Sequence, residues 1–429
     1  MKFSDIAHVT QDSREVKPGD FFVACRGEEV DGHDFIPEAL KRGAAGVLEE
    51  EELFDLAKRK LDAFKPKVIG ITGSVGKTTT KEAVAAVLSE RFKVLKSTGN
   101  INTRRSLSIF ILNKLCRDHE IFVVEMAMDR FGEIAEICET VKPDIAVLTA
   151  ITETHPEKLE SLERIKETKA QILDALGVDG LAVLNRDDSD VVDVSACAPG
   201  KIIWFGVGDR KNPKGEGFLA NDIKMGLAGT SFSLRRVIGS DDNKLKLVSL
   251  KVPLLGRTAI YAVLAAAAVG LELGLSFSEI KRGSAKLKPV PQRLNLIESK
   301  NGFYILDDSY NASDVSASAA LEVLADLPAK RKIAVLGDML ELGSHEKKAH
   351  QTVGKKVATM ADVLVAVGKL GRLIGESAQE AGLASVYFAK DNQQVIEILK
   401  REISLQEGDI VLVKGSRGAE MEEIVAALR

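Results

Sequence analysis

Lys67-Val-Ile-Gly-Ile-Thr-Gly-Ser-Val-Gly-Lys-Thr-Thr-Thr-Lys-Glu82 is the stretch that decides the fold of this 429-residue chain. Its β-branched start predicts a buried strand, two glycines then form a turn, and a Lys-Thr pair opens a helix. In this P-loop order, backbone N–H groups and the helix N-terminus face an anion. The stretch therefore predicts a site for a nucleoside triphosphate with Mg²⁺.

The residues of this turn have separate expected roles. Lys77 is expected to reach the β- and γ-phosphates, and the Thr78 hydroxyl to bind Mg²⁺. The strict pattern has a glycine where Ile71 stands, so an ordinary glycine turn before an amphipathic helix is the alternative interpretation. The expected nucleotide-binding residues of the turn are Gly73, Ser74, Val75, Gly76, Lys77, Thr78 and Thr79.

Composition describes a globular protein of several domains, because 429 residues exceed what one core organises. A net charge of −4 and an aromatic content of 5% argue against nucleic-acid partners and against a polybasic membrane anchor. The four cysteines lie far apart, and the N-terminus has no signal-peptide core. We therefore expect a cytoplasmic protein without membrane insertion, in which the apolar run 259–275 is a buried helix.

Alternating apolar strands and amphipathic helices predict an α/β fold. We expect a small N-terminal α/β domain (1–66), a central P-loop ATPase domain with a parallel sheet (67–290) and a C-terminal Rossmann-like α/β domain (291–429). Short alternating runs over 218–250 predict an antiparallel extension on one sheet edge. The main expected strands are 68–72, 121–125, 145–149, 181–185 and 202–206 in the central domain, and 303–307, 333–337, 363–367 and 410–414 in the third.

Polar residues at strand ends are further candidates. Glu125 ends a strand, where an acidic residue can hold the Mg²⁺ of a P-loop enzyme, although a surface glutamate is the alternative. Asp307-Asp-Ser-Tyr-Asn311 suits ribose or cation binding, or else an Asx-turn. Lys414-Gly-Ser-Arg417 could bind a carboxylate or phosphate, or it could be an ordinary loop with a glycine turn and solvated cations. His155 and Lys169 alone give little signal.

These segments occur together in the Mur ligase family, the ATP-dependent amide-forming enzymes of peptidoglycan precursor synthesis, and the chain resembles that family nearly end to end. The resemblance is carried by Asp12-Ser-Arg14, by Gly73–Glu82, by Asp307-Asp-Ser-Tyr-Asn-Ala312 and by Val335-Leu-Gly-Asp-Met-Leu-Glu-Leu-Gly343, with His350 beyond them. The Asp-Asn-Pro-Arg segment of the branch that adds diaminopimelate or lysine does not occur in the sequence.

The resemblance implies an activity. The enzyme would join D-alanyl-D-alanine to UDP-N-acetylmuramoyl-tripeptide, using ATP and Mg²⁺ to form an acyl-phosphate intermediate, and we expect it to act as a monomer. Thr78 and Glu125 would hold one Mg²⁺, and His155 would hold a second together with Lys169 in carbamylated form. A carbamate supplies an anionic oxygen ligand, whereas a free ammonium would repel the metal.

The resemblance also assigns the remaining candidate residues. Lys77, Lys169 and His155 would form the catalytic set, and Arg293, Asp308 and Asn311 would contact ATP from the third domain. The expected substrate-binding residues are Ser13, Arg14, Asn102, Lys414, Ser416 and Arg417. Ala259 and Ala262 stand where the family has asparagines, so adenine recognition is expected to differ.

Three other functions fit parts of the sequence. A GTP-binding switch could use Asp129-Arg-Phe-Gly132 and Asn185-Arg-Asp-Asp188, although both patterns are short and loose. The enzymes that add glutamate to folates share the ATP core but lack a UDP-sugar module. The Asp12-Ser-Arg14 segment suggests such a module here and so argues against that class. A non-catalytic nucleotide-binding module is the third alternative.

Overall fold

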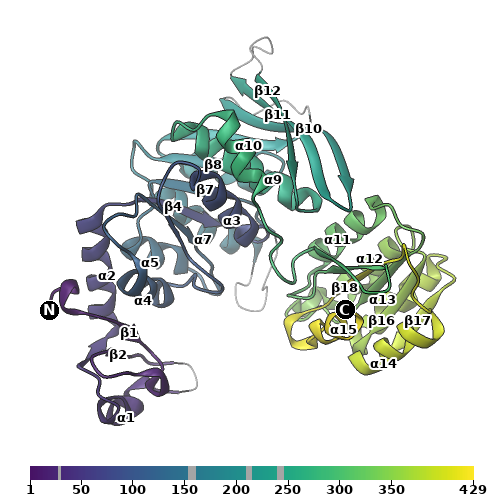
Figure 1. Ribbon diagram of the computed structural model, residues 1–429, viewed down its shortest axis with the longest axis horizontal. Helices are drawn as coiled ribbons and strands as arrows, with labels where there is room; N and C mark the ends of the chain where they lie inside the picture. Colours follow the sequence, from purple (N-terminus) through teal and green to yellow (C-terminus); the bar gives the residue numbers. More distant parts are fainter. Residues whose placement is uncertain (28–29, 153–160, 209–214, 239–245) are drawn as a thin grey trace.

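The structure is a computed structural model that describes residues 1–27, 30–152, 161–208, 215–238 and 246–429. Within these ranges the strands form sheets of three, nine and six strands, one in each of three successive units (Figure 1). The first and third units lie on opposite sides of the central one. The predicted α/β class with three domains is confirmed, while the boundaries at 66/67 and 290/291 stay predictions.

The first unit is a small parallel sheet joined to the central unit by a helix. Its strands are ordered β1-β2-β3. Asn113 fixes this unit to the central one, because its side chain accepts from Val9 N and donates to Val9 O, both at 2.8 Å. The elements are β1 (Val9–Thr10), β2 (Phe21–Ala24), α1 (Ile36–Lys41), β3 (Gly46–Glu49) and the connecting α2 (Glu50–Phe64).

The central sheet has the order β12-β11-β10-β9-β8-β7-β4-β6-β5. Its strands pair in parallel from β5 to β10, and β11 and β12 then add antiparallel pairs, which confirms the expected extension on one edge. The strands are β4 (Lys67–Thr72), β5 (Val94–Lys96), β6 (Ile121–Glu125), β7 (Ile145–Leu148), β8 (Leu181–Asn185), β9 (Lys201–Val207), β10 (Glu216–Gly226), β11 (Gly229–Ile238) and β12 (Lys246–Val252).

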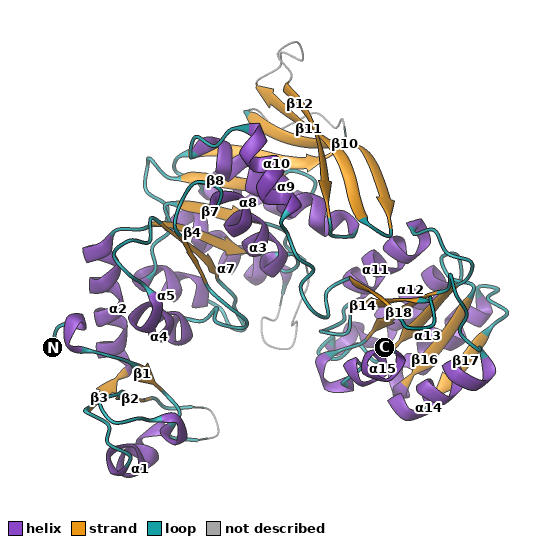
Figure 2. Ribbon diagram, in the orientation of Figure 1, coloured by secondary structure: helices purple, strands orange, loops and turns teal. Residues whose placement is uncertain are grey.

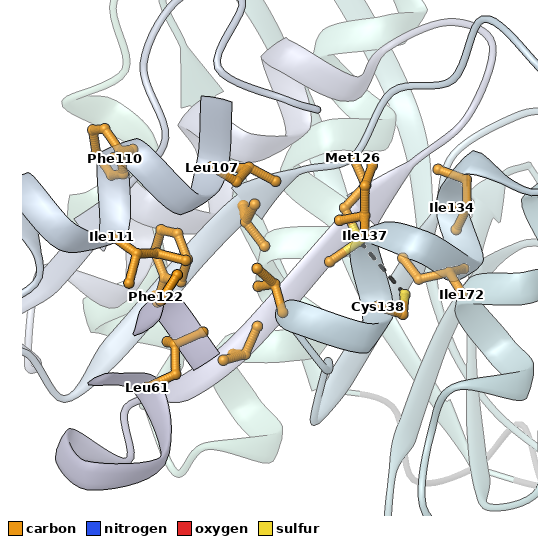
Figure 3. Packing of buried hydrophobic residues seen from close by; sticks show 14 of the residues in the cluster. Leu61, Leu107, Phe110, Ile111, Phe122, Met126, Ile134, Ile137, Cys138 and Ile172 are labelled. Atoms are coloured by element: carbon orange, nitrogen blue, oxygen red, sulfur yellow. Dashed lines mark hydrogen bonds between the residues drawn. The ribbon is translucent and has the colours of Figure 1, made fainter. Parts of the chain in front are cut away.

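Helices cover both faces of this sheet (Figure 2). Successive strand residues alternate between two apolar clusters, as Phe122 faces one and Val123 the other. Figure 3 shows the first cluster, where Phe110 packs near Phe122 and Cys138 contacts Met126. One face carries α4 (Arg104–Lys114), α5 (Glu133–Thr140), α7 (Leu162–Asp174) and α8 (Ser189–Val194), and the other carries α3 (Lys77–Leu88), α9 (Gly256–Glu272) and α10 (Phe277–Ala285).

Helix α9 contains most of the long apolar run, and its residues 262–269 are fully buried, as expected. Among the described helices, none is long and apolar enough to cross a membrane.

The third unit has the sheet order β13-β14-β18-β15-β16-β17, parallel except for β13. Because β14, β18 and β15 are parallel neighbours, the loops after them leave the same edge of the sheet. The elements are β13 (Asn295–Glu298), β14 (Tyr304–Asp307), α11 (Asp314–Asp326), β15 (Lys332–Leu336), α12 (Glu346–Val357), β16 (Val363–Val367), α13 (Gly368–Glu380), β17 (Val386–Ala389), α14 (Asn392–Glu397), β18 (Ile410–Lys414) and α15 (Glu422–Leu428).

The connection between the central and third units is held at one point. Gln292 and Leu294 both have a left-handed backbone, with φ of 61° and 49°. Gln292 O accepts from Tyr310 N at 3.2 Å, and Leu294 N donates to Asp308 Oδ1 at 3.1 Å. The connecting segment is therefore bonded to the loop after β14, and it places Arg293 beside that loop.

Candidate active site

The turn between β4 and α3 has the predicted glycine geometry. Gly73 and Gly76 have φ of +146° and +87°, which side-chain-bearing residues rarely adopt. A Cβ on Gly73 would lie 2.0 Å from Thr149 Oγ1, so this position has no room for a side chain. The strand, turn and helix are therefore those expected of a P-loop, in which the first N–H groups of the helix have no partner within the helix.

Lys77 opens α3 and lies inside the turn. Its ammonium donates to Gly73 O at 2.7 Å and to Ser74 O at 3.3 Å. Burial lowers the pKa of Lys77, while the nearby Glu125 carboxylate acts in the opposite direction. A cation at this place can neutralise phosphate oxygens bound by the turn.

Glu125, at the end of β6, is buried with 4% of its surface exposed, so the interpretation as a surface glutamate is wrong. Its Oε2 accepts from Thr78 Oγ1 at 2.9 Å, and its Oε1 accepts from Asn102 Nδ2 at 3.2 Å. A hydroxyl and a carboxylate at this spacing are the oxygen ligands that Mg²⁺ prefers. The residues present therefore fit a magnesium ion.

Lys81 belongs to this cluster, although the sequence did not single it out. Its side chain is 1% exposed, and its ammonium lies 4.0 Å from Glu125 Oε2 and 3.6 Å from Glu82 Oε1. The two carboxylates balance a buried positive charge that would otherwise be costly.

Lys169 lies on α7 and is 3% exposed. Burial lowers its pKa well below the usual value, and the positive charge of Lys77 lowers it further. Among the described residues, its ammonium has neither a hydrogen bond nor an ion pair. His155 lies outside the described residues, so its expected pairing with Lys169 stays a prediction.

The loop after β14 brings three predicted residues together. Lys414 Nζ lies 2.5 Å from Asp308 Oδ2 and donates to Asn311 O at 2.8 Å. Asp307 instead accepts from Ser309 N and Ser309 Oγ, which is the Asx-turn alternative. Burial raises the pKa of Asp307. Asp307 therefore forms the turn, while the adjacent Asp308 bonds to Lys414 and to Leu294 N.

Tyr310 connects the third unit to the central one. Its hydroxyl donates to Asn100 Oδ1 at 3.0 Å. The Arg293 guanidinium lies 4.1 Å from the centre of the Tyr310 ring, and that of Arg417 lies 6.0 Å from it. The contact with Asn100 was not predicted, because no local pattern joins positions so far apart in the chain.

A cavity of about 390 Å³ lies between the two units. The predicted residues that line it are Ser74, Val75, Gly76, Lys77, Thr78, Thr79, Asn102, Glu125, Arg293, Asp308, Asn311 and Lys414. Ala259 also lines it, whereas Ala262 is fully buried in α9. The predicted residues Gly73, Lys169, Ser416 and Arg417 are not in the cavity wall. Ser416 is buried, and Arg417 pairs with Glu422 at 2.8 Å.

Ser13 and Arg14 line another cavity, of about 470 Å³, in the first unit. Ser13 Oγ donates to Glu38 at 2.8 Å, and the Arg14 guanidinium binds both oxygens of Asp12, at 2.9 and 2.7 Å. Arg105, on α4 of the central unit, also lines this cavity and was not predicted.

Family models match the three units. Residues 71–270 match the Mur ligase middle domain. Residues 292–417 match the model described as Mur ligase, glutamate ligase domain, and residues 5–97 match the one described as Mur ligase family, catalytic domain.

Individual relatives match nearly end to end. The UDP-N-acetylmuramoyl-tripeptide–D-alanyl-D-alanine ligase of Escherichia coli is 35% identical over 98% of this chain and 93% of its own length. The protein of that name from Bacillus subtilis is 32% identical over 98% and 92%. Among solved structures, MurF from Acinetobacter baumannii has a TM-score of 0.87 at 26% identity, covering 99% of this chain and 93% of that one. MurF ligase from Thermotoga maritima in complex with ADP has a TM-score of 0.85 at 31% identity, covering 100% and 98%.

The P-loop, the three-unit fold and these matches define an ATP-dependent amide ligase. The chain belongs to the Mur ligase family. The GTP-switch alternative is not supported, because Asn185 donates to Thr149 O at 2.8 Å and Asp188 caps α8. The first and last residues of the segment 185–188, which a guanine-reading loop would use, therefore have structural partners within the protein.

Proposed function

We propose that this protein joins D-alanyl-D-alanine to UDP-N-acetylmuramoyl-tripeptide in peptidoglycan precursor synthesis. The cavity between the central and third units carries the proposal, because it combines Lys77 of the P-loop with Asp308 and Lys414 of the third unit. A ligase of this kind must hold a nucleotide and an incoming amine on opposite sides of one reacting carboxylate. The nearly full-length relatives of that name support the choice of substrates.

The proposed reaction has two steps. A carboxylate is a poor acyl donor, so the γ-phosphoryl group of ATP is first transferred to a carboxylate oxygen of the tripeptide, which gives ADP and an acyl phosphate. The dipeptide amine then attacks the acyl carbon, the bond from that carbon to the phosphate oxygen breaks, and the nitrogen loses a proton. Lys77 would neutralise charge on the transferred phosphoryl group, and its position inside the P-loop turn supports this role.

Thr78 and Glu125 would hold the Mg²⁺ of the nucleotide. A bound magnesium ion supplies positive charge to the phosphate oxygens. The hydrogen bond from Asn102 fixes the orientation of the Glu125 carboxylate, while Lys81 supplies a positive charge beside it.

The remaining predicted residues would bind the three substrates. Arg293, Asp308 and Asn311 would contact ATP from the third unit, and Ser13 and Arg14 would contact the UDP-sugar. The loop with Lys414, Ser416 and Arg417 would bind the carboxylate of the dipeptide. We propose a monomer located in the cytoplasm.

Phosphate release tests the proposed function. ATP and UDP-N-acetylmuramoyl-tripeptide are incubated with and without D-alanyl-D-alanine, and the product mass is measured. Phosphate release that requires both substrates, with a product heavier by the dipeptide, is the expected result. Release that depends on neither substrate would contradict the proposal.

We also propose that Lys169 carries a carbamate. Its lowered pKa supports this, because the neutral amine, and not the ammonium, adds to CO₂ to give a carbamate and a proton. Because only the neutral amine reacts, acidification, which protonates the amine, disfavours the modification.

We therefore expect Lys169→Ala to lower activity by about 100-fold or more, with partial rescue by short carboxylates, and CO₂-free buffer to lower wild-type activity. Mass spectrometry of the intact protein at alkaline pH provides a readout besides activity. Lys166→Ala is a matched control on the same helix, since Lys166 pairs with Asp190 at 2.7 Å outside the cavity. Full activity in Lys169→Ala would remove the carbamate from the mechanism.

A further inference from the structure

The loop after β15, residues 337–342, faces the cavity and has no role in the function proposed above. Leu340, Glu341 and Leu342 line the cavity. Strand β15 pairs in parallel with β18, with Leu336 opposite Lys414. The loop therefore leaves the sheet beside the Lys414–Arg417 loop, on the side of the cavity opposite the P-loop.

Two buried polar side chains hold this loop in place. His350 Nε2 accepts from Met339 N at 2.9 Å, and Ser416 Oγ accepts from Leu340 N at 2.8 Å. The side chains of His350 and Ser416 are 0% and 3% exposed. Because His350 Nδ1 lies 2.7 Å from Glu346 O, to which only an N–H can donate, the ring is the neutral Nδ1–H tautomer. Buried hydrogen bonds of this kind fix a loop rigidly.

Glu341 stands at the most strained point of the loop. Its φ is +63°, in the left-handed region that residues with a side chain rarely adopt. Strain of this kind persists where the surrounding structure enforces it, and it concentrates at ligand-binding positions. Here the two hydrogen bonds to residues 339 and 340 enforce it, and they place Glu341, an exposed residue, at the cavity wall.

The neighbours of Glu341 indicate what it binds. Leu340 is 41% exposed and lines the cavity, so it offers an apolar surface beside Glu341. A Cβ on Gly418 would lie 3.3 Å from Leu340 Cδ1, so the Arg417 loop runs directly beside it. Lys414, at the start of that adjacent loop, also lines the cavity. A carboxylate, an apolar surface and an ammonium on two adjacent loops match a small zwitterion with an apolar middle.

We propose that Glu341 binds the α-ammonium of the incoming dipeptide and that Leu340 contacts its first methyl group. This inference rests on the proposed function, which supplies the dipeptide as a substrate. A two-residue peptide spans at most about 7 Å, a length suited to two neighbouring loops. Glu341 thereby holds the nucleophilic nitrogen on the side of the cavity opposite the P-loop, so that it approaches the acyl carbon from that side.

Glu341 acts here by binding and not by taking the proton. Removing its charge should therefore raise the dipeptide KM and leave the nucleotide steps unchanged.

The test is Glu341→Gln in the full-length enzyme. The KM for D-alanyl-D-alanine is expected to rise by about 10- to 100-fold, with the KM values for ATP and for the UDP-tripeptide within about twofold of wild type. Glu420→Gln is the matched control, because Glu420 is an exposed glutamate of the same unit with φ of +47° that lies outside the cavity wall. We expect its dipeptide KM to be unchanged.

A second variant separates binding from folding. In Glu341→Gly the backbone strain is relieved, so the midpoint of thermal unfolding should rise while the dipeptide KM still increases. A purely structural role for Glu341 would instead leave the KM unchanged. Inhibition by N-acetyl-D-alanyl-D-alanine, which has no ammonium, should be equal in wild type and Glu341→Gln.

The outcomes separate this inference from the function on which it rests. Wild-type phosphate release that is independent of D-alanyl-D-alanine would overturn the proposed function. Wild-type release that requires the dipeptide, with an unchanged dipeptide KM in Glu341→Gln, would overturn the role of Glu341 alone.

Discussion

The Lys77→Ala enzyme is expected to lose at least about 1000-fold in kcat for phosphate release with both substrates. Lys77 is the cation inside the P-loop turn, bonded to Gly73 O and Ser74 O, and burial lowers the pKa of its ammonium. Charge on the transferred phosphoryl group is stabilised most by a cation that is already in place and desolvated. Single-turnover measurements with saturating ATP isolate this step.

Two comparisons make the result interpretable. Lys67→Ala removes an exposed lysine at the start of β4 and should leave kcat unchanged. Calorimetry with ADP shows whether the Lys77→Ala variant still binds nucleotide, and we expect weaker binding with a folded protein by circular dichroism. A kcat within tenfold of wild type would refute the assignment of Lys77.

The strands that could be predicted from the sequence are those buried on both faces. Strands β4, β6 and β18 read as continuous apolar runs because helices cover both sides of each. Strands β5 and β17 were missed because each is a short edge strand, of three and four residues, and most of these residues are only half buried. Edge position thus hides a strand from sequence reasoning.

Residues of the site that depend on local chain geometry could be predicted, while those that depend on packing could not. The glycine turn and the strand-end Glu125 follow from short patterns. Lys81 resembles any lysine of an amphipathic helix, and it is buried because α3 packs against both the sheet and α9. Arg105 reaches the cavity of the first unit only through the docking of α4.

The same distinction explains why Glu341 could not be predicted as a site residue from the sequence. Its motif was visible in the sequence, yet its role depends on a left-handed backbone that His350 and Ser416 enforce from other elements. A glycine or asparagine is the usual residue for such a backbone, so a glutamate there gives no local signal.

Glu125→Gln is expected to lower turnover by at least about 100-fold and to raise the Mg²⁺ concentration needed for half-maximal activity. The variant keeps the size and hydrogen-bonding shape of the side chain near Thr78 and Asn102 but removes its charge. A neutral amide is a weaker magnesium ligand, and it leaves the ammonium of Lys81 with one carboxylate fewer.

Glu82→Gln supplies the matched control for this prediction. Both carboxylates lie beside Lys81, but only that of Glu125 is bonded to Thr78. If Glu125 holds the metal, its replacement should weaken the Mg²⁺ dependence of ADP binding in calorimetry, whereas Glu82→Gln should affect thermal stability alone. Equal loss of Mg²⁺ dependence in the two variants would mean that the charge balance of Lys81, and not direct coordination by Glu125, controls magnesium binding.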